Sequence, residues 1–120
     1  MVSPHELASF IASSFRSVWA LELLLLLKRE DRPCSPEELV ATMRASASVV
    51  DKALESLVAA GLAGMDGPCA AYMPVSPEVD LLVDQTEQLY RSKPDRVRRL
   101  IIASSNKGLA AFSDAFRLKE

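Results

Sequence analysis

The chain has 120 residues, enough for one ordinary domain, and 49% of them are hydrophobic, enough for a core. Four glycines argue against an all-β fold rich in tight turns, and two cysteines are too few for a secreted disulfide scaffold. No secretory signal is visible, and the longest apolar block, at 23–27, is far shorter than the roughly 20 residues of a membrane span. We therefore expect a cytoplasmic protein without a membrane partner.

The first half of the chain predicts four helices. Ser3 can cap the first, with Pro4 at its first position and Glu6 three residues after the cap. The run VWALELLLLLKRE at 18–30 is apolar almost all round, which predicts a central buried helix. SPEELVATMR at 35–44 repeats the serine-proline start, and a short link leads to a helix over 46–60.

The second half predicts a hairpin followed by more helices. Gly61 suits the position just after a helix, and Asp66-Gly67 is a hairpin turn signal with a returning strand at 70–75. SPEVD at 76–80 starts another helix, Pro94 opens a further one, and LAAFSDAFRL at 109–118 closes the chain.

A three-helix core is expected from these patterns, and Trp19 is expected to lie in it rather than in a ligand site. The helix at 46–60 is expected to turn Val49, Ala53, Leu54, Leu57 and Val58 inward. The other expected core residues are Leu24, Leu27, Leu39 and Met43.

The order helix, helix, short turn, helix and hairpin over residues 15–75 resembles a winged helix-turn-helix. Ser35 to Leu39 resembles the opening of the helix before the turn, and VVDKALESLVAAGLAG at 49–64 resembles the recognition helix. With one helix before and others after, the layout is similar to the MarR-like group of bacterial transcription regulators. The expected fold is mainly α: a single domain over 1–120, with a winged-helix core at 15–75 and C-terminal helices at 76–120.

The resemblance implies a small transcription regulator that binds duplex DNA with the helix at 46–60 in the major groove. Serine and lysine can hydrogen-bond to bases or phosphates, and alanine can meet a thymine methyl group. The candidate DNA-binding residues near this helix are Arg44, Ser46, Ala47, Ser48 and Lys52.

The charge distribution makes DNA binding depend on another part of the chain. Residues 35–74 hold two cationic and five acidic side chains, and the predicted wing holds no lysine or arginine. Residues 1–90 carry 6 cations and 13 acids, whereas residues 91–120 carry 8 and 3. Because DNA affinity comes from neutralised phosphates, the cations of 91–99 either help to bind DNA or form a solvated helix face. The five concerned are Arg91, Lys93, Arg96, Arg98 and Arg99.

A homodimer is expected through the apolar stripes of the C-terminal helices. The candidate contacts are Leu82, Leu89, Leu109, Phe112 and Phe116. The alternative function is a protein-interaction module, an adaptor or an inhibitor of another regulator, that kept the winged-helix shape without its DNA charge.

Other chemistry has little support in the sequence. With one histidine and no nucleophile-base pattern, we expect no enzyme, and no cofactor or metal is implied. Cys34 and Cys69 are two ordinary thiols or, if the first turn and the wing meet, a redox pair or half a metal site.

Overall fold

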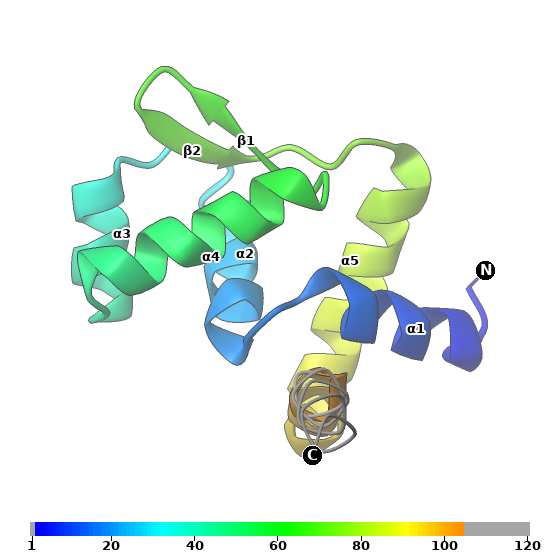
Figure 1. Ribbon diagram of the computed structural model, residues 1–120. Helices are drawn as coiled ribbons and strands as arrows, with labels where there is room; N and C mark the ends of the chain where they lie inside the picture. Colours follow the sequence, from blue (N-terminus) through cyan, green and yellow to red (C-terminus); the bar gives the residue numbers. More distant parts are fainter. Residues whose placement is uncertain (1, 105–120) are drawn as a thin grey trace, which may run out of the picture.

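The computed structural model describes residues 2–104 and confirms a mainly helical chain with one small antiparallel sheet (Figure 1). A further helix covers residues 94–104. The predicted closing helix at 109–118 lies outside the described residues. The elements that precede 94–104 are α1 (Pro4–Ser14), α2 (Val18–Glu30), α3 (Pro36–Met43), α4 (Ala47–Ala59), β1 (Ala63–Asp66), β2 (Cys69–Tyr72) and α5 (Pro77–Ser92).

Serine caps begin all five of the helices α1 to α5. In each case the hydroxyl accepts a hydrogen bond from the backbone N–H three residues later, which satisfies one of the free donors of the first turn. Ser35 and Glu38 form a full capping box at α3. The predicted starts of α1, α3 and α5 are confirmed, since each has its serine followed by proline.

The end of α4 and the hairpin also follow the sequence signals. Gly61 has φ +75°, Leu62 N–H donates to Leu57 O and Gly61 N–H donates to Val58 O, which is the Schellman pattern. Gly67 has φ +60° at the first position of a two-residue loop, as a type II′ turn requires. The strands pair in the register Ala63–Tyr72 to Asp66–Cys69.

α2 is the centre of the core. Seven of its residues are buried, and it packs against α4 and β2, while α1 packs against α5. The link before α3 reaches the sheet, because Cys34 and Ala70 exchange two backbone hydrogen bonds of 2.8 Å. Among the described residues, no single helix has the length and composition to cross a membrane. α1 and α2 meet that test only together, with a bend of 105° between them.

Two expectations about the core are wrong. Trp19 is 46% exposed, because the side chain of this first-turn residue lies beyond the buried stretch of α2. On α4 the buried residues are Val50, Ala53, Leu54 and Leu57, so Val49 is only half-buried and Val58 is 41% exposed. The buried stripe of α4 is therefore narrower than expected, with Val50 at its centre and Val49 and Val58 at its edges. Met43 is half-buried at the edge of the core, and the other expected core leucines are buried.

α5 is attached to the core by polar contacts as well as by packing. Lys28 Nζ lies 2.9 Å from Asp84 Oδ1 and 3.0 Å from Glu87 Oε1, and these bonds raise the pKa of the ammonium group. Tyr90 donates its hydroxyl hydrogen to Glu22 on α2. Burial and this bond to a carboxylate raise the pKa of Tyr90. These contacts keep α5 against the face of α2 that α4 leaves free.

Candidate interaction surfaces on either side of α4

α4 carries opposite charges on its two long sides. Its buried stripe packs onto α2, α3 and β1, which leaves residues such as Asp51, Lys52 and Glu55 exposed. Asp51 and Glu55 line a cleft shared with the hairpin, whereas Lys52 lines a different cleft shared with the start of α2. Neighbours in sequence, Asp51 and Lys52, thus belong to separate surfaces, because successive residues of a helix are about 100° apart around its axis.

The first surface is the α4–hairpin groove, a cleft of about 510 Å³ between α4, β1 and the start of α3. Its floor and walls are largely apolar, with Val58 41% and Met65 50% exposed. The lining residues are Pro36, Asp51, Leu54, Glu55, Val58, Ala59 and Met65, so its charged side chains are two carboxylates and no cation lines it. An apolar cleft with an acidic edge suits a basic amphipathic ligand.

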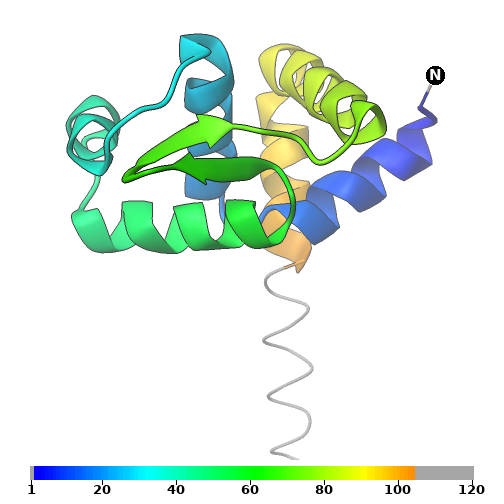
Figure 2. The same ribbon diagram turned by 90° about the horizontal axis from the view of Figure 1, so that it is seen from above.

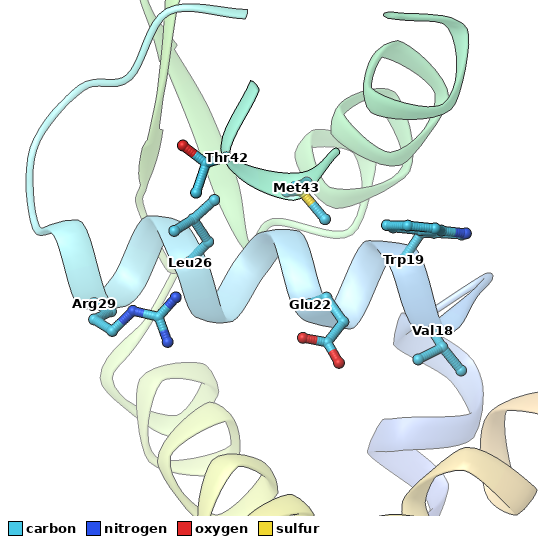
Figure 3. Close-up of a pocket in the computed structure, with 7 residues that line it drawn as sticks. All are labelled: Val18, Trp19, Glu22, Leu26, Arg29, Thr42 and Met43. Carbon is cyan, nitrogen blue, oxygen red and sulfur yellow. The ribbon is translucent and has the colours of Figure 1, made fainter. Parts of the chain in front are cut away.

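The second surface surrounds Trp19, which stands between two clefts. One, of about 390 Å³, is formed with α4 and includes Arg16 and Lys52. The other, of about 410 Å³, runs along α2 beside the last turn of α3 (Figure 3). Figure 3 shows Arg29 and Trp19 at opposite ends of this stripe, with Leu26 and Met43 between them. We call Arg16, Trp19, Arg29 and Lys52 the Trp19 surface.

The candidate DNA-binding residues near α4 lie together at its N-terminal end. Ser46 caps the helix with its hydroxyl, and Ala47 and Ser48 are exposed in its first turn. Arg44 is exposed at the end of α3 with φ +54°, two residues before the cap. Lys52 is exposed one turn further on.

The cations of 91–99 lie elsewhere. Figures 1 and 2 place the helix at 94–104 on the far side of α2 from the N-terminus of α4. Arg91 pairs with Glu87 on α5, and Arg98 pairs with Asp95 and lies 5.6 Å from the centre of the Tyr90 ring. Arg96 borders a cleft between α1 and α5, Arg99 donates to Asp95 O, and Lys93 follows the end of α5. These residues therefore do not supply charge to the start of α4 in this arrangement.

The candidate dimer residues in the described part of the chain are Leu82 and Leu89, both half-buried on α5. Leu89 packs against the core, so little of it remains for a partner. Leu81 and Ile102 are more exposed, at 41% and 49%. Leu109, Phe112 and Phe116 lie outside the described residues.

The two cysteines are free, and the first turn and the hairpin do meet at Cys34. Burial raises the pKa of the Cys34 thiol, which keeps it in the less reactive protonated form. Its sulfur lies within 4.8 Å of carboxylate oxygens of Glu30 and Glu38. Both carboxylates already pair with Arg32, and the Arg32 bond lowers the pKa of Glu38. The carboxylates of Glu30 and Glu38 are therefore already engaged in ion pairs.

Trp19 and Arg16 line one cleft that the sequence patterns did not predict. A polar segment, SSFRS at 13–17, directly before an almost wholly apolar helix was the available signal. Its serines and Arg16 are polar on either side of the buried Phe15. Comparisons with family models, with curated proteins and with solved structures find no match for this chain.

Proposed function

We propose that this chain is a winged-helix module that binds another protein in the α4–hairpin groove, and that it does not read DNA with that face. In this proposal α3 and α4 form the helix-turn-helix, the hairpin is the wing, and the MarR-like resemblance concerns the shape. The observation that carries the proposal is the lining of the groove: exposed apolar side chains with Asp51 and Glu55 and no cation.

Electrostatics favours protein over DNA as the ligand of this groove. A winged-helix reader presents the recognition helix and the wing to DNA, and most of its affinity for phosphates comes from cations. Here Asp51, Glu55 and the hairpin residue Asp66 would face the phosphates instead, and all three are exposed. A basic amphipathic segment reverses the sign, because its cations meet the two carboxylates while its apolar side chains cover Val58 and Met65.

Duplex DNA remains the second candidate, and one observation favours it. The N-terminal end of α4 is exposed, its free N–H groups carry a partial positive charge, and Arg44 and Lys52 stand within two turns of it. A protein that used only this end would touch DNA weakly and with few phosphates, so its affinity would fall gently with salt.

One pair of variants separates the two functions. Asp51→Lys with Glu55→Lys reverses the groove charge, and Glu6→Lys with Asp31→Lys makes the same net change at exposed sites outside it. We expect a fluorescein-labelled basic amphipathic peptide to bind the wild type and the control equally, and to bind the groove variant at least roughly tenfold more weakly. Fluorescence anisotropy measures each affinity.

A random DNA duplex is the second probe in the same titration, at low and at moderate salt. The expected result is no binding by the wild type at protein concentrations up to about 100 μM, the weak end of ordinary non-specific affinity. Wild-type binding that Lys52→Glu or Arg44→Gly abolishes would support the DNA candidate instead. Equal peptide binding by the groove variant and the control would refute the groove as the site.

A further inference from the structure

We propose that the Trp19 surface is a second docking site, and that it takes an acidic amphipathic helix of another protein. The site is independent of the α4–hairpin groove, since α4 separates the two. A chain with both sites would be an adaptor that joins a basic partner to an acidic one.

The apolar part of the argument is the exposure of Trp19. Its side chain has a large apolar ring, 46% of the residue is in water, and apolar clefts lie on both sides of it. Tryptophan, arginine and methionine are among the residues enriched at protein interfaces. Here Trp19 lies beside Met43 and between Arg16 and Arg29, so the surface has the residue types that are enriched at interfaces.

The charged part of the argument concerns three free cations. None of the ion pairs within residues 2–104 involves Arg16, Arg29 or Lys52. The one carboxylate in the two clefts is that of Glu22, which accepts a hydrogen bond from Tyr90. The surface is therefore positive within a region of the chain that is acidic as a whole, and it complements a partner that carries glutamate or aspartate.

The dimensions fit a short helix. From the Ser17 cap to Arg29 the surface follows α2 for about 18 Å, which is the length of about 12 helical residues. Apolar side chains at positions i, i+4 and i+7 of such a helix would enter the clefts beside Trp19. Its acidic residues would then lie over Arg16 and Lys52 at one end and over Arg29 at the other.

A single-stranded nucleic acid fits this surface less well. It would also stack on an aromatic ring and pair its phosphates with cations. However, Glu22 lies between Trp19 and Arg29, so a strand that ran from one cation group to the other would carry phosphate past a carboxylate (Figure 3). The apolar lining of both clefts, with Val18, Leu26 and Val49, suits aliphatic side chains better than phosphates.

The test selects peptides from a random display library of about 14 residues, long enough for the span of the surface. The purified full chain is the bait. Selected peptides should be acidic with apolar residues at i, i+3 or i+4, and i+7. Because Trp19 is the only tryptophan of the chain, binding should shift its emission to shorter wavelength as the ring leaves water.

Variants assign the binding to this surface. Trp19→Ala, and Arg16→Glu with Lys52→Glu, should each weaken the selected peptides at least roughly tenfold in calorimetric titrations. Leu81→Ala removes an apolar side chain of similar exposure on α5, and Lys93→Glu with Arg99→Glu makes the same charge change near it. These controls should bind like the wild type, and circular dichroism should show unchanged helix content in all variants.

Five results would overturn the proposal. The first three are a library that yields no peptide or only basic ones, equal affinity for Trp19→Ala, and an emission shift with a poly-dT oligonucleotide but not with the peptides. The fourth is evidence that the Trp19 surface binds the acidic groove of a second copy of this chain. In that case the molecular mass measured by light scattering would fall both in Trp19→Ala and in Asp51→Lys with Glu55→Lys. The fifth is loss of peptide binding in that groove variant, which would separately locate the peptides there and not at Trp19.

Discussion

At the scale of single residues, Arg32 holds the junction between α2, the link to α3 and α3 itself. Its guanidinium pairs with Glu30 at the end of α2 and with Glu38 in the first turn of α3. Glu38 also accepts the backbone N–H of Ser35, so one carboxylate serves both the ion pair and the capping box. The start of α3 is therefore sensitive to the charge of Glu38.

This sensitivity predicts a pH dependence. The bond from Arg32 lowers the pKa of Glu38 below its usual 4.5, so its contribution to stability is present above about pH 4.5 and is lost as the pH falls through the lowered value. Glu38→Gln keeps a capping side chain and removes the charge. We expect its urea midpoint to lie below that of the wild type at neutral pH, and the two to converge once the pH is below the lowered pKa of Glu38. Glu37→Gln, which removes a neighbouring carboxylate that does not contact Arg32, is the control. A difference that persists unchanged at low pH would contradict this role.

At the scale of elements, the position of α5 depends on the contacts that hold it against α2. Lys28 bridges Asp84 and Glu87, and the Glu87 side chain, which also pairs with Arg91, is mostly buried. Tyr72, the last residue of β2, donates its hydroxyl hydrogen to Asp80 near the start of α5. α5 is therefore fixed both to the helical core and to the sheet.

Removal of the Lys28 charge should loosen α5. In Lys28→Met, Asp84 loses its cation and the poorly hydrated Glu87 keeps only the longer contact to Arg91, which we expect to cost about 1 kcal/mol in the free energy of unfolding. Arg29→Met makes the same chemical change at a neighbouring residue that forms no ion pair within 2–104, and should stay within about 0.5 kcal/mol of the wild type. Urea denaturation measures both. Equal losses would mean that the Lys28 pairs do not stabilise the contact.

At the scale of the whole molecule, the homodimer stays a prediction. In the described residues it is supported by the exposed Leu81 and Ile102, which lie on the C-terminal helices through which the homodimer is expected. Light scattering at micromolar concentration should give twice the chain mass of 13.1 kDa. Ile102→Asp should halve that mass without loss of helix content, since its side chain is 49% exposed and does not belong to the core. A wild-type mass of one chain would contradict the prediction.

The positions of the helices and of the hairpin turn follow from local signals in the sequence. Serine caps, proline at the first helical position, Gly61 after α4 and Gly67 in the hairpin each act within about four residues, so they can be read without the fold. The buried character of α2 follows in the same way from a run that is apolar on every side.

Only the tertiary structure decided which surfaces these elements form. The exposure of Trp19, the separate clefts that Asp51 and Lys52 line on either side of α4, and the distance of the helix at 94–104 from the start of α4 all depend on how helices pack. Helix packing sums many weak contacts between residues that are far apart in the chain, and no local pattern encodes that sum. Charge could therefore be counted along the chain, but its distribution between the two sides of α4 could not.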